Sequence, residues 1–511
     1  MHYAANTKAP QARADGNGRL RDGREGRQAI GDHRSYPRAS RLDWKARPCG
    51  PVGSMTAKRL APKKGRGSKQ KRPRPKHLNP PDIPAELERL FPEETIKRIA
   101  RDTGFIKRER VVHPVAFFWA VVLGFGTHLQ RTLSDLRRNY EYISGEDIAM
   151  SSWFDRFTPA FVDFLRGAVA HAFQQTANDA GRVLDEKLKS FADILIFDNS
   201  VVRLCDTLAK RFPATRSKVI AAGVKVSLLI SAVANGPKSV SIHSERTADI
   251  KTLRIGPWVG DRIILFDLGF YKFQLFARIG DYGGFFVSRM KANGNPTFLR
   301  SLKVHRGRSI DLAGKTWQDI KDRLDRDVLD AEVEVSFSRR QYRGKRSSDS
   351  MILRLVAVWD DEHDEYHVYL TNLPQDVLSA EDVAALYRVR WEVELVFKEL
   401  KSQYALDKVK TTNPNIVFGL IYTAILTLIV SRRLHNLLLR SVPREEASRY
   451  MPLLWSKVFT QFGNLLLEAM MEHIGHRKGC KDAVVLLAAL YEKEARDPHV
   501  KRHRLRGGWY A

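Results

Sequence analysis

The sequence has few cysteines, no signal pattern and no apolar run of full membrane-spanning length. Its three cysteines (Cys49, Cys205 and Cys480) lie far apart and form no C-x-x-C pair. This count excludes a disulfide framework, and the spacing argues against a structural zinc site. The longest apolar run, residues 416–430, would form a helix of roughly 22 Å, shorter than the ~30 Å hydrocarbon core of a bilayer. We therefore expect a buried helix there, no membrane partner and a reducing, cytoplasmic setting.

Acidic residues are also scarce relative to basic ones. The chain has 86 Lys and Arg against 58 Asp and Glu, a formal net charge of +28. Residues 1–80 contain 21 basic and 5 acidic side chains, so this segment carries +16 and the remaining residues carry +12. A surplus in both parts favours a polyanionic partner, most simply nucleic acid. The alternative is a charged surface that only promotes solubility.

Residues 1–80 are rich in Arg, Lys, Gly and Pro and show no apolar periodicity. Such a composition cannot bury enough apolar surface to offset chain entropy, which predicts a disordered basic tail. Residues 63–77 could neutralise phosphates without sequence preference. Because Met55 begins a more ordinary sequence, we also expect residues 1–54 to precede the true translation start.

The pattern changes near residue 190 from helical to strand-like. Three strands in a meander are followed by two strands that are separated by helices, an order typical of a ribonuclease-H-like α/β fold with a mixed sheet. The expected strands are 192–204, 223–233, 238–246, 262–267 and 284–291, with a hairpin turn at 234–236 and helices near 247–255 and at 271–279.

The predicted regions differ in composition and periodicity. Within the first helical region, residues 133–157 could form a helix-turn-helix DNA reader or simply part of a helical core. The regions are a basic tail (1–80), a helical DNA-binding domain (81–185), the ribonuclease-H-like domain (190–291 and 381–411), an inserted β-rich domain (292–380) and a helical C-terminal region (412–511).

Two apolar strands end in an aspartate. The run 194–197 leads into Asp198, and the run 263–266 leads into Asp267. Continuous apolar runs mark strands that are buried on both faces. A carboxylate at such a strand end is costly to desolvate unless it is paired or binds a metal, although each Asp could also simply begin a turn. Asp193, Asp206, Asp261 and Asp281 flank the same strands, and we expect them to be solvated.

A strongly patterned helix is expected over residues 381–404. At 100° per residue, four polar side chains fall within an arc of about 60°, and the valines lie opposite them. Of the glutamates at 392, 394 and 399, only Glu394 falls on the polar arc; Glu392 and Glu399 point sideways. An ordinary amphipathic helix with i,i+4 ion pairs is the alternative. The four polar residues are Tyr387, Arg390, Glu394 and Lys401.

These residues match the Y-x2-R-x3-E-x6-K signature of transposases of the insertion-sequence-four type, and the sequence resembles that family over about 190–430. The helix YRVRWEVELVFKELKS, the preceding TNLP and the blocks FDNSVVRL and FDLGFYKF are all similar to the family's motifs. The resemblance implies a catalytic DDE triad of Asp198, Asp267 and Glu394 on a ribonuclease-H-like fold.

The resemblance also implies cofactors and partners. Two Mg²⁺ or Mn²⁺ ions, bridged by Asp198 and held by Asp267 and Glu394, would support attack of water and then of a 3′-OH on phosphodiesters. Tyr387, Arg390 and Lys401 would contact phosphates of the transposon end. We expect double-stranded DNA as partner, a homodimer in the DNA complex and a bacterial, nucleoid-associated location.

In such transposases the inserted β domain helps to handle a flipped base. An aromatic platform such as Trp317 or Trp359 could serve here, or either indole could belong to the core of the insertion. Two other interpretations remain for the whole chain. One is a non-catalytic DNA-binding repressor or decayed transposase, and the other is a metal-dependent nuclease that does not join its products to a target.

Overall fold

The computed structural model describes residues 82–475, except 109, 128–131, 177–181, 216–220, 305–309, 339–346 and 408–410, and also residues 488 and 491. All of these residues belong to one compact unit, Arg74–Ala511. The predicted basic tail, residues 1–80, and most of the chain after residue 475 lie outside the described residues.

The first region is helical, as expected. Aromatic side chains make up much of its core: Phe117 contacts Trp153 at a centroid distance of 5.6 Å, and Phe105 stacks on Phe164 at 4.9 Å. Its elements are α1 (Ile83–Leu90), α2 (Glu93–Asp102), α3 (Pro114–Trp119) with a π-helical continuation (Ala120–Phe125), α4 (Leu133–Ser144), α5 (Met150–Phe154) and α6 (Pro159–Thr176).

The predicted helix-turn-helix segment is a long helix followed by a very short one. Helix α4 begins at a Thr132 cap and ends where Gly145 adopts a φ of 73°, which glycine tolerates. Helix α5 has only 5 residues, and the buried Trp153 donates from Nε1 to the Leu133 carbonyl at 3.0 Å. The pair is therefore packed into the helical core, and DNA reading by it stays a prediction.

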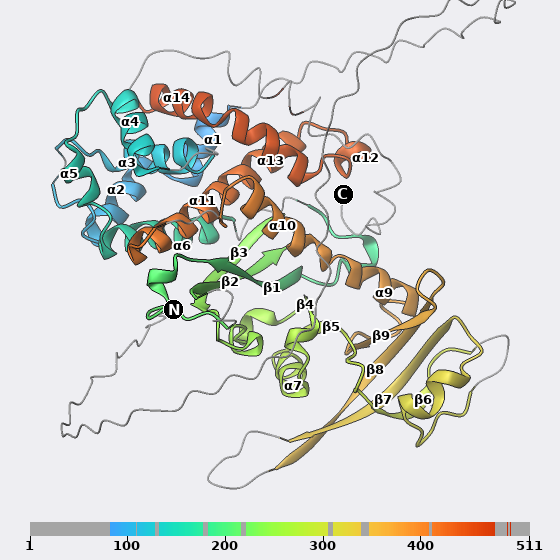
Figure 1. Ribbon diagram of the computed structural model, residues 1–511. Helices are drawn as coiled ribbons and strands as arrows, with labels where there is room; N and C mark the ends of the chain where they lie inside the picture. The colour runs from blue at the N-terminus through green and yellow to red at the C-terminus, as the bar shows by residue number, and fades with distance from the viewer. Residues whose placement is uncertain are drawn as a thin grey trace, which may run out of the picture. The chain divides into compact units, whose positions relative to one another are not determined.

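The strands form one mixed nine-stranded sheet in the order β3-β2-β1-β4-β5-β9-β8-β7-β6 (Figure 1). Strand β1 pairs antiparallel with β2 and parallel with β4, and β4 pairs parallel with β5. The strands are β1 (Asp193–Arg203), β2 (Gly223–Ser231), β3 (Gly236–Ser244), β4 (Arg262–Phe266), β5 (Phe285–Arg289), β6 (Thr297–Ser301), β7 (Val328–Ser338), β8 (Ser348–Asp360) and β9 (Glu365–Thr371).

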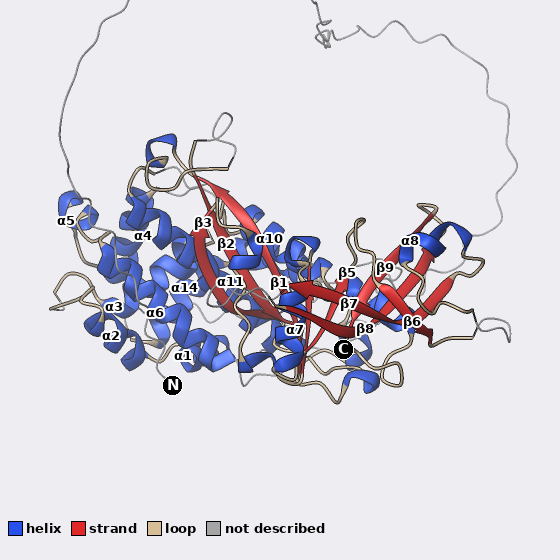
Figure 2. Ribbon diagram, turned by 90° about the horizontal axis from the view of Figure 1, so that it is seen from below, coloured by secondary structure: helices blue, strands red, loops and turns tan. Residues whose placement is uncertain are grey.

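The β-rich residues 292–380 extend this sheet. Strand β9 pairs antiparallel with β5 through Val287 and Thr371, and β8, β7 and β6 follow in turn. Figure 2 shows these strands continuing beyond β5, with the short helix α8 (Trp317–Ile320) beside them. The region thus shares its hydrogen-bonded ladder with the predicted ribonuclease-H-like part.

Helices cover both faces of the sheet around β1. Ile194 and Ile196 pack with the helices of one face, whereas Leu195 and Phe197 pack toward the other, as the period of two requires. In Figure 1, α10 and α11 lie above β1–β3, and α7 lies below β4 and β5. These helices are α7 (Phe273–Asp281), α9 (Ala380–Arg388), α10 (Trp391–Ser402), α11 (Pro414–Leu439), α12 (Arg444–Ala447), α13 (Pro452–Gln461) and α14 (Gly463–His473).

Two predicted helices differ from the structure. Residues 247–255 contain only a short 3₁₀ turn, Asp249–Lys251, rather than a helix. The predicted helix 381–404 is divided between α9 and α10. At the junction, the backbone amides of Val389 and Arg390 donate to the carbonyls three residues earlier, those of Leu386 and Tyr387. These 3₁₀-type hydrogen bonds interrupt the i to i−4 pattern of the α-helix.

The long apolar helix α11 is a core element. By length and composition it could cross a membrane, but 67% of its most apolar 18-residue window is buried inside the protein. Val417, Ile421, Leu428 and Leu434 have no exposed surface. This burial agrees with the expectation of a buried helix at residues 416–430.

Candidate active site

Asp198 and Asp267 lie side by side at one end of the parallel strands β1 and β4. The register pairs Phe197 with Phe266, so the two aspartates follow at equivalent positions. Both side chains point to the face that α9 and α10 cover, because they alternate with Phe197 and Phe266. Asp198 is half-buried and Asp267 is exposed, so an entering ligand could reach both.

Glu394 of α10 completes the acidic cluster. The pKa of Asp198 is raised to about 6, chiefly by burial and also by the negative charges of Asp267 and Glu394, against the opposing effects of the Asn199 backbone amide and Arg390. Arg390 also donates from Nη2 to Glu394 Oε1 at 2.8 Å. The structure therefore brings together three carboxylates and one guanidinium.

Tyr387 and Lys401 are placed differently from each other. The Tyr387 hydroxyl donates to the carbonyl of Phe266 at 3.4 Å, and its ring contacts Tyr369 at a centroid distance of 5.2 Å. Burial raises the pKa of Tyr387 to about 12, so its phenol is neutral. Lys401 is half-buried and lies seven residues after Glu394, roughly 10 Å along the helix. Tyr387 thus joins the cluster from inside the protein, and Lys401 lies at a distance from it.

Helix α10 is held to the core by a buried ion pair. Glu399 and Arg432 of α11 pair with less than a tenth of either side chain exposed. Tyr404 donates to Glu399 Oε1 at 3.0 Å, and Arg432 donates to Asn235 Oδ1 at 3.3 Å in the β2–β3 turn. The position of Glu394 in the site therefore depends on contacts one turn and more along its helix.

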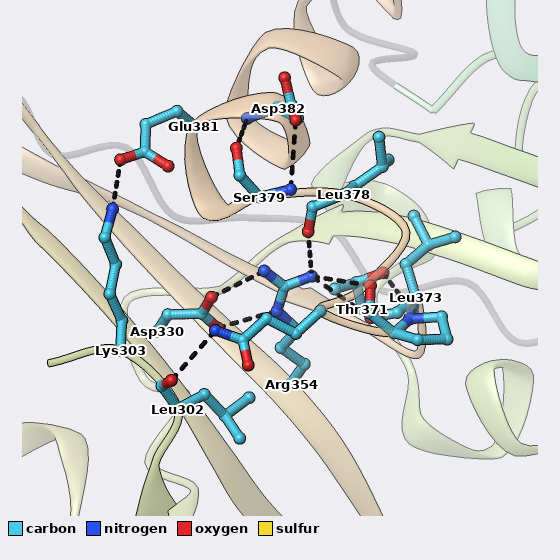
Figure 3. A network of polar contacts seen from close by, with 12 residues as sticks. Leu302, Lys303, Asp330, Arg354, Thr371, Leu373, Leu378, Ser379, Glu381 and Asp382 are labelled. Atoms are coloured by element: carbon cyan, nitrogen blue, oxygen red, sulfur yellow. Dashed lines mark hydrogen bonds and ion pairs between the residues drawn. The ribbon is translucent and has the colours of Figure 1, made fainter. Parts of the chain in front are cut away.

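Helix α9 is fixed by another buried arginine (Figure 3). Arg354 of β8 makes two hydrogen bonds to Asp330 of β7, at 2.8 and 2.7 Å, and donates to the Leu378 carbonyl at 2.8 Å. The next residue, Ser379, caps α9 by accepting from the Asp382 amide at 3.1 Å. The extended part of the sheet thereby sets where the helix bearing Tyr387 begins.

A second polar network lies beside Asp198. Lys225 donates to Asp249 Oδ1 at 2.6 Å, and Nδ2 of the Asn199 side chain donates to the same oxygen at 2.8 Å. The other Asp249 oxygen lies near Gly269, where an added Cβ would approach it to 3.2 Å. This network connects the residue after Asp198 to the turn after Asp267. Asp249 was not predicted from the sequence; the one signal was Lys225 within an apolar strand.

Trp391 was also missed. It is 57% exposed and lies between Arg390 and Glu392 at the start of α10, three residues before Glu394. Of the two proposed platforms, Trp317 is 7% exposed and packs against Tyr366 at 6.1 Å, which makes it part of the core of the extended sheet. Trp359 is half-buried and lies 4.8 Å from the same Tyr366 ring.

The expectation for the flanking acids is wrong for Asp193. It is 3% exposed and accepts hydrogen bonds from the Ser231 hydroxyl at 2.6 Å and the Val233 amide at 3.2 Å. These partners compensate its desolvation at the end of β1 opposite the cluster. Asp206, Asp261 and Asp281 are exposed, as expected.

Comparison with known proteins finds similar transposases. The family model for the transposase DDE domain matches residues 189–430. The transposase for insertion sequence element IS1151 of Clostridium perfringens is 23% identical over 376 residues, which cover 68% of this chain and 78% of that protein. The transposase for insertion sequence element IS231F of Bacillus thuringiensis subsp. israelensis is 22% identical over 411 residues, covering 71% and 83%. The function they support is that of a DNA transposase.

The matched domain contains every residue of the acidic cluster, from Asp198 to Glu394. Among solved structures, the piggyBac transposase in a synaptic complex with hairpin DNA is similar, with a TM-score of 0.41 and 13% identity. The match covers 82% of this chain and 86% of that one.

Proposed function

We propose that this transposase cleaves transposon ends and joins them to target DNA by a metal-dependent cut-and-paste mechanism, as a DDE transposase of the insertion-sequence-four type with a ribonuclease-H-like catalytic fold. The observation that carries the proposal is the meeting of Asp198, Asp267 and Glu394 at the end of two parallel strands. Clustered like charges of this kind are stabilised when cations neutralise them.

The donor set fits divalent ions that prefer oxygen ligands. Three carboxylates with a single nearby guanidinium suit Mg²⁺ or Mn²⁺. Among the described residues, these three are not a group whose ligand atoms all lie within 4.8 Å of one another. Asp198, Asp267 and Glu394 are the residues that would hold the two ions. Bound there, the ions would activate the attacking oxygen and stabilise the leaving oxygen.

The surrounding residues would hold the DNA. Arg390 faces Glu394 and Tyr387, and its fork of donors suits a phosphate near the cut. We assign Tyr387 to support of the site and Lys401 to a phosphate farther along the DNA. The exposed Trp391 is the best-placed aromatic ring for stacking on an unpaired base. The partners are the inverted repeats and target DNA, held by a homodimer in the cytoplasm.

The test uses the purified full chain, Mn²⁺ or Mg²⁺, and DNA that carries the inverted repeats flanking its own gene. Cleavage at the repeat ends followed by joining to a target plasmid is expected. Asp198→Asn, Asp267→Asn and Glu394→Gln should each reduce cleavage by at least about 10³-fold, since each removes a ligand or charge needed at the transition state. The matched control is Asp281→Asn, an exposed acid beyond the cluster.

Three other outcomes would contradict the proposal. Cleavage by Asp198→Ala at the parental rate would show that the acids are not catalytic. Tight binding without cutting would favour a repressor or decayed transposase. Cutting without joining would favour a nuclease.

A further inference from the structure

A second group of metal-ligand side chains lies at the turn between β8 and β9, apart from the acidic cluster. Asp360 ends β8, His363 lies in the turn, and His367 lies on β9. One ligand atom from each lies within 4.8 Å of the others. We propose that this D-x2-H-x3-H group binds one divalent d-block cation such as Zn²⁺, independently of the ions assigned to the acids.

The ligand atoms already converge on one oxygen. His363 Nδ1 lies 2.9 Å and His367 Nε2 lies 2.7 Å from Asp360 Oδ2. Zn–N and Zn–O bonds of about 2.0–2.2 Å place tetrahedral ligands roughly 3.3 Å apart. An ion therefore needs these atoms to separate by only a few tenths of an ångström, which side-chain rotation can supply.

The carboxylate is oriented for this task by the backbone. The Glu362 amide donates to Asp360 Oδ1 at 3.0 Å, which leaves Oδ2 for the imidazoles or for a cation. Asp360 and His367 are on paired strands, since Asp360 pairs with Glu365 and Val358 with His367. Two of the three ligands are thus fixed by the sheet, and a metal would order the turn that holds the third.

The chemistry of this site differs from that of the acidic cluster. Two imidazoles and one carboxylate favour Zn²⁺, Ni²⁺ or Cu²⁺ over Mg²⁺. His363 is 66% exposed and the other two side chains are about a quarter exposed, so a further coordination position would face solvent or a phosphate oxygen. His367 also shares a face of β9 with Tyr369, which contacts Tyr387, so the ion would lie on the side of the sheet that carries the catalytic acids.

The test measures binding of Zn²⁺ or Co²⁺ alone to the full chain by calorimetry, with Co²⁺ absorption reporting imidazole ligation. Because the chain has other histidines, the readout is the difference between variants. His363→Ala with His367→Ala should bind one equivalent fewer than the parent, and either single change should weaken that equivalent by at least about tenfold. The matched control, His243→Ala on β3, should bind as the parent does.

A parallel measurement in the Asp198→Asn, Asp267→Asn, Glu394→Gln background separates this site from the proposed active site. The equivalent that depends on His363 and His367 should persist in that background, whatever its effect on DNA cleavage. Equal stoichiometry and affinity in the parent and the double-histidine variant would overturn the proposal, and would leave the two His–Asp contacts as hydrogen bonds of the turn.

Discussion

At the residue scale, the charge of Asp198 opposes folding of the metal-free protein at neutral pH. Its pKa rises from 3.8 to about 6, chiefly through burial. The pKa of Asp198 is higher in the folded state than in the unfolded state. Protonation of Asp198 therefore adds to the free energy of unfolding as pH falls from about 6 toward 3.8, and this contribution is absent above about pH 6. A shift of two units corresponds to about 3 kcal/mol, less where solvent screens the carboxylate.

Asp198→Asn should therefore raise the free energy of unfolding at pH 7.5 by about 1–3 kcal/mol, and this gain should shrink below about pH 5. Urea unfolding in the presence of a chelator measures it, with the exposed Asp281→Asn as control. Equal stability of the variant and the parent at pH 7.5 would mean that burial and the neighbouring acids do not destabilise the charged Asp198 carboxylate.

Arg390 influences the charge state of the same group. Its guanidinium lowers the pKa of Asp198, against burial and the two neighbouring acids. Arg390→Met should raise that pKa above about 6, so the acid limb of the cleavage–pH profile should move to higher pH. Arg390→Lys should leave the limb in place while lowering the rate, since Lys keeps the charge without the fork of donors.

The matched control is Arg388→Met, an exposed neighbour on α9. If it shifts the acid limb as much as Arg390→Met does, the effect comes from overall charge and not from the contact with the cluster.

Trp391 tests the assignment of the stacking ring. Its indole is exposed on α10, three residues before Glu394, whereas Trp359 is half-buried against Tyr366. Trp391→Ala should weaken binding of an end with an unpaired terminal base by about 1–3 kcal/mol, and Trp391→Phe should restore part of it. Fluorescence of 2-aminopurine at the end reports stacking. If Trp359→Ala weakens this binding and Trp391→Ala does not, the stacking ring is Trp359 of the extended sheet.

At the scale of elements, the Glu399–Arg432 pair fixes α10 on α11. Arg432→Met leaves a buried carboxylate with Tyr404 as its remaining partner, which should cost about 3–5 kcal/mol of folding stability. Glu399→Leu combined with Arg432→Met removes both charges and should recover most of this stability. Thermal and urea unfolding of the four proteins in the cycle measure the coupling, and additive effects would contradict it.

At the scale of the whole molecule, charge is divided between the tail and the body. Deleting residues 1–80 removes a net +16 and leaves +12. Affinity for unrelated double-stranded DNA should then fall, and the slope of log K against log salt should become shallower by about 0.9 for each phosphate that the protein no longer neutralises. Unfolding of the truncated chain controls for damage to the fold. An unchanged slope would place non-specific binding in the body alone.

The individual strands and helices could be predicted from the sequence because each is marked by the spacing of its own apolar residues. The apolar run of β4 and its closing Asp267 lie within six residues, and the predicted strands at 192–204, 223–233 and 262–267 contain β1, β2 and β4. Apolar side chains recur with the period of the element they form, so neighbouring residues suffice to recognise it. The glutamate chosen by helical geometry, Glu394, lies close enough to Asp198 for its charge to raise the pKa of that carboxyl.

Only the tertiary structure decided which distant residues meet. The pairing of β9 with β5, the contact of Tyr387 with the Phe266 carbonyl and the convergence of Asp360 with two histidines depend on backbone and side-chain geometry that no local period encodes. The burial of Asp193 and the exposure of Trp391 likewise follow from what packs around them. The physical reason is that desolvation and pairing are set by neighbours in space, whereas periodicity is set by neighbours in the chain.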